Sequence, residues 1–164
     1  KAISDTLISR VRLYSFHLVP KNILETALKN RYPDSAVHTI ALILSFSLGK
    51  PGKSIELLEN PDLLKQYQSI YNDLDLWYRK PDIVRQFAKS EELTADPFKI
   101  KIFFEIFLHF LRHELLSLGS KGADHLEQIP RLIHLINASK RTMYLIEQNI
   151  NPRLAMENLM LQFI

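Results

Sequence analysis

Residues 97–118 read PFKIKIFFEIFLHFLRHELLSL, and this is the most apolar stretch of the chain. Its apolar residues recur about every three to four positions, a spacing that predicts an α-helix. The polar stripe of this helix is narrow and consists of Lys101, Glu105, His109 and Arg112. A helix with so little polar surface is expected to be buried on most sides, by its own domain or by another subunit.

Three dipeptides mark positions where helices are expected to begin. Asn60-Pro61, Asp96-Pro97 and Asn151-Pro152 each precede a run of apolar residues with helical spacing. Asn and Asp accept hydrogen bonds from the free N–H groups of a first turn, and Pro at the first helical position loses no hydrogen bond. The three pairs together are therefore strong signals for the start of a helix.

Helical spacing also extends over most of the remaining chain. Further helices are expected at residues 20–28, 37–48, 51–58, 83–87 and 130–149. Gly49 is expected to end the second of these, because glycine tolerates the left-handed conformation that follows many helices. In the helix of residues 130–149, the inward side chains are expected to be Leu132, Ile133, Ile136, Met143 and Ile146. Two of the four glycines lie within residues 117–124, which predicts a loop there.

One segment near the start differs from this pattern. Residues 11–16 (VRLYSF) contain β-formers and predict a single strand. One strand cannot make a sheet, so its neighbours are expected upstream of Lys1, in a longer protein. Apart from this strand, the chain is predicted to be all-α. A boundary is expected near Asn60, between a bundle of three short helices and about five helices that follow.

Composition excludes several classes of protein. The chain has 21 basic and 18 acidic residues, a net charge of +3, and no dense block of either sign. It contains no cysteine, which excludes disulfides, Cys-zinc sites and cysteine nucleophiles. No run of about 18 uncharged apolar residues occurs, so no membrane span is expected. The mild positive charge favours an ordinary domain over a nucleic-acid-binding helical module, which remains an alternative.

One group of residues has the spacing of a metal site. Glu105, His109 and His113 lie four residues apart on one predicted helix, and two histidines at this spacing can share a metal ion. The glutamate does not lie between the histidines as it does in H-E-x-x-H, and no further ligand is marked elsewhere. A polar stripe on an amphipathic helix is the favoured interpretation. A helical metal-dependent enzyme remains the alternative from a different class.

Other chemical signals are weak. The chain has no phosphate-binding G-x-x-x-x-G-K-[ST] loop, no G-x-G-x-x-G loop and no G-x-S-x-G context for a serine nucleophile. Residues 50–53 (KPGK) form a basic turn where an anion could bind, although a solvated turn is favoured. Tyr67, Tyr71, Trp77 and Tyr78 lie near basic residues and could stack bases. At helical spacing, these aromatic residues are expected to belong to the core.

Three segments resemble the AAA+ clamp-loader family of bacterial DNA polymerase III. Residues 6–11 (TLISRV) resemble the T-I-x-S-R-C segment near the end of the ATPase domain, with Val11 in place of the family's Cys. Residues 40–58 (IALILSFSLGKPGKSIELL) resemble the lid helices, including a G-x-P-G-x-A-L turn typical of the delta-prime branch. Residues 149–161 (NINPRLAMENLML) resemble the N-x-N-P-R-L-x-L-E-x-L-L segment of the delta-prime collar, and this match is the most specific.

The resemblance implies a division of the chain and roles for two residues. Residues 1–16 would be the end of an ATPase domain, 17–60 a three-helix lid and 61–164 a five-helix collar. Arg10 would be an arginine finger that reaches the ATP of a neighbouring subunit, where a guanidinium neutralises charge on the γ-phosphate. Gly52 stands where ATP-binding relatives carry the sensor-2 arginine, which implies that this subunit binds no ATP. A gamma/tau-type subunit is therefore the less favoured alternative within the family.

The implied function is assembly without catalysis. The chain would belong to a cytoplasmic clamp loader that places sliding clamps on DNA during replication. Its collar would bind the homologous delta-type and gamma/tau-type subunits, and DNA would be contacted only through the assembled complex. The resemblance implies no cofactor, no bound metal and no membrane association. Part of the apolar surface of the last three predicted helices is expected to stay exposed in the isolated chain, for a homologous collar to cover.

Overall fold

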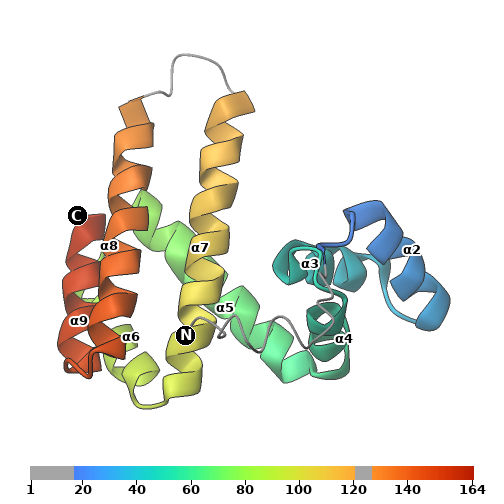
Figure 1. Ribbon diagram of the computed structural model, residues 1–164, viewed down its shortest axis with the longest axis horizontal. Coiled ribbons are helices and arrows are strands. Elements are labelled where there is room, and N and C mark those ends of the chain that lie inside the picture. Colours follow the sequence, from blue (N-terminus) through green and yellow to red (C-terminus); the bar gives the residue numbers. More distant parts are fainter. Residues whose placement is uncertain (1–16, 121–126) are drawn as a thin grey trace, which may run out of the picture. The chain divides into compact units, whose positions relative to one another are not determined.

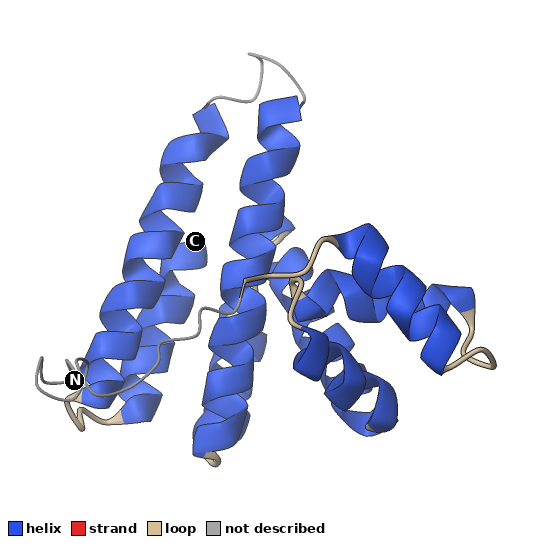
Figure 2. Cartoon of the chain, turned by 45° about the vertical axis from the view of Figure 1, so that its right-hand side comes forward, coloured by secondary structure: helices blue, strands red, loops and turns tan. Residues whose placement is uncertain are grey.

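The described secondary structure consists of helices joined by short connections (Figures 1 and 2). The computed structural model describes residues 17–120 and 127–164, and no strand occurs within these ranges. The all-α prediction is therefore confirmed for this part of the chain. The strand predicted at residues 11–16 and the residue Arg10 lie outside the described residues.

The chain divides into two compact units between Asn60 and Pro61. In the first unit, the described helices are α2 (Lys21–Arg31), α3 (Val37–Ser47) and α4 (Pro51–Glu59). In the second unit, they are α5 (Pro61–Arg79), α6 (Ile83–Thr94), α7 (Pro97–Ser120), α8 (Ile129–Glu147) and α9 (Pro152–Met160), followed by the 3₁₀ turn η2 (Leu161–Phe163). The division falls at the boundary that the sequence suggested, whereas the assignment of the units as lid and collar remains a prediction.

Two of the three predicted capping pairs cap the helix that follows them. Asn151 Oδ1 accepts hydrogen bonds from the backbone N–H groups of Arg153 and Leu154, at 3.0 and 3.4 Å. Asp96 Oδ1 accepts from the N–H of Phe98 at 2.8 Å. Asn60 acts on the preceding helix instead, because its Nδ2 donates to the carbonyl of Glu56 near the end of α4.

Gly49 closes the turn between α3 and α4, as its sequence position suggested. Its φ of +76° lies in the left-handed region, and the preceding Leu48 also has a positive φ of 52°. A Cβ at position 49 would lie 2.7 Å from the carbonyl oxygen of Val19, which is too close. The Gly49 carbonyl also accepts a hydrogen bond from the N–H of Val19 at 2.8 Å. Both backbone conformation and close approach therefore require glycine here.

The core of the second unit is built around α7, which packs against α5, α6 and α8. Its side chains at Phe103, Phe107 and Phe110 have no exposed surface. The ring of Phe107 lies 5.5 Å from that of Phe163 in η2, and Phe163 lies 6.3 Å from Trp77 of α5. The expectation that α7 is buried on most sides is confirmed, and its own unit supplies the cover.

The inward face of α8 differs from the prediction. Its buried residues are Leu132, Leu135, Ser139 and Thr142, whereas Ile133 is 48% exposed. Ser139 donates its hydroxyl to the carbonyl of Ile136, and Thr142 donates to that of Ala138. Each hydroxyl is satisfied within the helix, so these small side chains can be buried at little cost. The sequence prediction treated Ser139 and Thr142 as polar and therefore placed the inward face of α8 on the wrong side of the helix.

Two helices are longer than expected. Helix α7 continues through Gly119 to Ser120, into the segment predicted as a loop. Helix α6 continues to Thr94 and buries Gln86, Ser90 and Leu93, whereas Val84 is 76% exposed. The added residues of α6 include the buried Ser90 and Leu93, so packing against the rest of the unit accompanies the longer helix.

Candidate functional site

Gly52 lies in the first turn of α4 and is exposed. A Cβ at this position would meet no atom within 4 Å, so a larger side chain could be accommodated. Packing therefore does not explain the absence of an arginine at this position. Arg10, the predicted arginine finger, lies outside the described residues.

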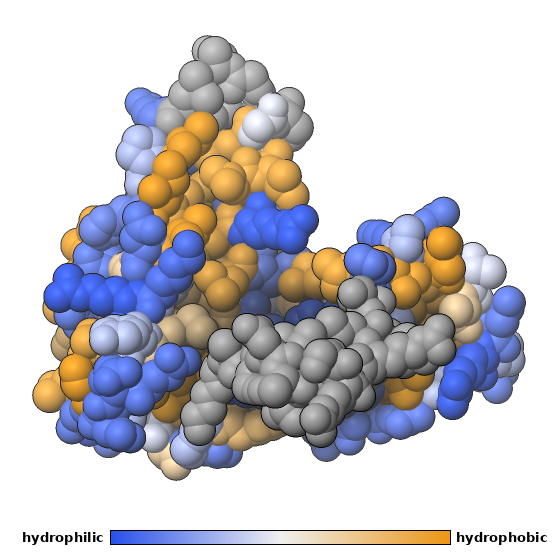
Figure 3. Space-filling view, viewed as in Figure 1, coloured by the Kyte–Doolittle hydropathy of each residue, from blue (hydrophilic) through white to orange (hydrophobic). Residues whose placement is uncertain are grey.

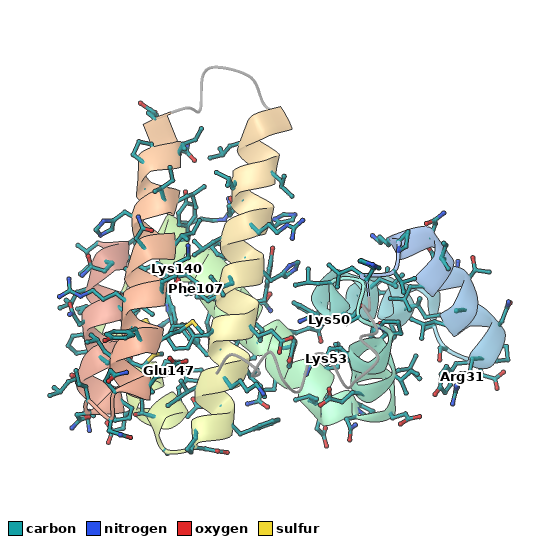
Figure 4. The ribbon with its side chains drawn as sticks, viewed as in Figure 1. Arg31, Lys50, Lys53, Phe107, Lys140 and Glu147 are labelled. Carbon is teal, nitrogen blue, oxygen red and sulfur yellow. The ribbon has the colours of Figure 1, made fainter. Side chains whose placement is uncertain are left out.

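The basic turn at residues 50–53 leads directly into α4. Lys50 is the N-cap residue and Pro51 occupies the first helical position. Lys53 Nζ lies 3.1 Å from Glu56 Oε2, and the Lys53 side chain is only 15% exposed. Figure 4 shows both lysines in this unit. Because one of the two cations is paired with a carboxylate, the turn offers less positive charge than the sequence suggests.

The residues Glu105, His109 and His113 lie on α7 beside two tyrosines of α5. The Tyr67 hydroxyl donates to Glu105 Oε2 at 2.8 Å. The Tyr71 hydroxyl lies 3.4 Å from His113 Nδ1, and the Tyr71 ring lies 6.0 Å from that of His109. Within residues 17–120 and 127–164, no three His, Asp or Glu side chains are grouped as metal ligands. Sequence reasoning identified the stripe on α7 but not its partners on α5.

Burial shifts the pKa values of two side chains, His109 and Tyr71, where α5 contacts α7. It lowers the pKa of His109 below its ordinary value, and the neighbouring charges of His113 and Arg112 lower the pKa further. Burial also raises the pKa of the Tyr71 phenol, and the carboxylates of Glu114 and Asp75 add to this effect. A neutral imidazole and a neutral phenol are therefore favoured at the contact, which suits the packing of two helices.

Replacing Tyr67 with Phe is expected to lower the free energy of unfolding by about 1–2 kcal/mol, because the Glu105 carboxylate loses a hydrogen-bond donor. Tyr144 is 60% exposed, so Tyr144→Phe is a matched control that should change stability by less than about 0.5 kcal/mol. Urea unfolding followed by the fluorescence of Trp77, the one tryptophan of the chain, measures both variants. Equal stability of the two variants would show that the Tyr67–Glu105 contact does not hold α5 to α7.

The predicted role of the aromatic residues of α5 as core is confirmed for three of them. Tyr67, Trp77 and Tyr78 are 1%, 2% and 8% exposed. The guanidinium of Arg131 lies 4.7 Å from the centre of the Tyr78 ring and also donates to the carbonyl of Phe163 at 2.7 Å. These contacts join α5, α8 and the C-terminal turn.

The segment at residues 149–161 positions one charged residue that has a structural role. Arg153 lies in the first turn of α9, where its Nε is 2.8 Å from Glu157 Oε1. Its terminal nitrogen is 3.2 Å from Glu91 Oε2 on α6. Arg153 therefore links α9 to α6, a contact that the sequence did not reveal.

Several apolar side chains of α7 and α8 are exposed in the second unit. Four of them are Leu108 and Leu116 on α7, and Ile133 and Tyr144 on α8, with exposed fractions of 37%, 65%, 48% and 60%. We call these four residues the α7–α8 surface. Figure 3 shows apolar atoms gathered over the upper parts of both helices. Ile133, Lys140 and Tyr144 share one side of α8 because they are spaced by seven and four residues.

Comparison with known proteins adds no identification. No protein-family model, curated protein or solved structure matches this chain. Among the helices within the described ranges, none has the length and apolar character needed to cross a membrane.

Proposed function

We propose that the chain provides the lid and collar of a delta-prime-type clamp-loader subunit of bacterial DNA polymerase III. The main support for the proposal is the position, within the two units, of the segments that resemble the clamp-loader lid and collar. Residues 40–58 span the α3–α4 turn of the unit with three described helices, and residues 149–161 include α9 of the unit with five. A lid motif in a three-helix unit, followed by a collar motif in a five-helix unit, is the order expected for this family.

The second unit would assemble with homologous collars through the α7–α8 surface. This surface consists of exposed apolar residues, and Lys140 lies beside them, on the side of α8 nearer to α7 in Figure 4. Subunit interfaces that form permanently have apolar centres and bury on the order of 2,000 Å² or more. Within this proposal, the first unit would act as a lid without binding nucleotide, because it carries Gly52 at the sensor-2 position.

Ile133→Glu is expected to weaken assembly at least about tenfold and to leave the fold intact, because an unpaired charge buried at an interface costs several kcal/mol. Val84 of α6 is 76% exposed, so Val84→Glu adds the same charge to another face of the unit as a control. Co-purification with the other ring subunits measures assembly, and circular dichroism measures folding.

The expected result is loss of the complex for Ile133→Glu and wild-type assembly for Val84→Glu. Tyr144→Glu and Leu116→Glu test the remainder of the surface in the same way. If all three variants of the α7–α8 surface are folded and assemble with wild-type affinity, this surface is not the site of assembly. Failure of the unmodified chain to associate with any ring subunit would contradict the proposed function itself.

A further inference from the structure

A groove lies between α8 and α9, next to the side of α8 that carries Ile133 and Tyr144. Its volume is about 230 Å³, and its walls include His134, Asn137 and Arg141 from α8 and Asn158 and Gln162 from the C-terminal segment. Leu145 and Leu159 add apolar surface to the lining. No carboxylate lines this groove, so its charge is positive.

One end of the groove is held in place by hydrogen bonds. His134 Nε2 lies 2.8 Å from Gln162 Oε1, which links α8 to the C-terminal turn. Gln162 Nε2 donates to the carbonyl of Asn158 at 3.1 Å, so the Gln162 amide is bonded at both ends. This end of the groove is therefore preorganised.

The middle of the groove offers groups that are open to a ligand. Among the described residues, the side chains of Asn137 and Arg141 have no hydrogen bond or ion pair. A guanidinium binds a carboxylate through two parallel hydrogen bonds. A carboxamide offers both a donor and an acceptor, the pair of groups that a peptide backbone presents. Apolar surface beside these groups suits an aliphatic side chain.

From this arrangement we propose that the α8–α9 groove binds a short acidic peptide segment of a partner protein. A carboxylate of the segment would bind Arg141, its backbone would bind Asn137, and an apolar neighbour would contact Leu145 and Leu159. The groove is smaller than most sites for small-molecule ligands, which are about 300–1,000 Å³, but it can hold one or two side chains. The proposal does not depend on the assembly proposed above.

A nucleic acid fits the groove less well. Binding to a nucleic acid backbone depends on several cations that contact successive phosphates. The lining contains one arginine, one histidine and three carboxamides. A single permanent cation among amides and apolar residues instead matches one carboxylate within a peptide.

The test measures binding of a short fluorescein-labelled peptide rich in Asp and Leu by fluorescence anisotropy. Arg141→Gln is expected to weaken binding at least about tenfold, because a hydrogen bond to a charged group is lost. Lys140→Gln is the control, because it removes the same charge from the adjacent residue, whose side chain is about 100° further round the helix. Lys140 does not line the groove, so its variant is expected to bind the peptide as the unmodified chain does.

Two further probes separate the alternatives. The same peptide with Asn in place of Asp is expected to bind at least about tenfold more weakly, because the charge-assisted contact is lost. A single-stranded thymidine oligonucleotide is expected not to displace the acidic peptide. No binding of the acidic peptide, equal effects of the two variants, or displacement by the oligonucleotide would each overturn the proposal.

Discussion

Phe107→Ala is expected to lower the free energy of unfolding of the second unit by about 3–5 kcal/mol. The Phe107 side chain has no exposed surface and lies at the centre of the core, where its ring is 5.6 Å from Phe103 and 5.5 Å from Phe163. Removing the ring leaves a cavity that the surrounding helices can close only in part. Total stabilities of domains are about 5–15 kcal/mol, so this loss is a large fraction.

Phe98→Ala is the matched control, because the same substitution is made on the same helix. Phe98 is 54% exposed, and its replacement is expected to change stability by less than about 0.5 kcal/mol. Urea unfolding followed by Trp77 fluorescence reports on the second unit, because Trp77 is the one tryptophan of the chain. If Phe107→Ala does not fold, Phe107→Leu keeps much of the volume and allows the comparison. Equal effects at positions 98 and 107 would contradict the described core.

Arg10→Ala in the full-length subunit is expected to lower the ATPase rate of the assembled complex, because an arginine supplied in trans typically contributes about 10³-fold or more to hydrolysis at the site that it reaches. The proposed function places the Arg10 guanidinium at the ATP of a neighbouring subunit, where it would neutralise charge that develops during hydrolysis. Arg10→Lys keeps the positive charge but loses the planar, two-pronged hydrogen bonding, so a large part of the loss should remain. The measurement is steady-state ATP hydrolysis by the complete ring at saturating ATP.

Arg31→Ala controls for the loss of a cation from the same chain. Arg31 lies in the last turn of α2 and is exposed (Figure 4), and its replacement is expected to leave hydrolysis unchanged. Assembly of the Arg10→Ala ring must match that of the unmodified ring, since a loss of subunits would also lower the rate. An unchanged ATPase rate in a complete Arg10→Ala ring would rule out the arginine-finger assignment.

Short-range chemistry explains the features that were predictable from sequence. Asn151 caps α9 because a carboxamide oxygen next to a first turn can reach two free N–H groups. Gly49 ends the turn after α3 because a residue with a Cβ disfavours the left-handed conformation. Both interactions occur between residues within a few positions of each other, so the sequence shows the partners together.

The partners of the candidate site could not be found in this way. Tyr67 and Glu105 are separated by 38 positions, and His134 and Gln162 by 28. Each of these residues is a common polar residue on a helix, and its sequence neighbours do not indicate which distant side chain it meets. The register between packed helices decides these pairs.

The sequence by itself determined that the described chain is helical, where most of its helices begin and that α7 is buried. These properties depend on apolar spacing and on caps that act over a few residues. Only the tertiary structure decided which side of α8 faces inward, where Ser139 and Thr142 are buried while Ile133 is exposed. It also created the α8–α9 groove, whose lining comes from residues far apart in the chain. The physical reason is that burial depends on how completely neighbouring helices cover a side chain, and that cover exists only after the helices pack.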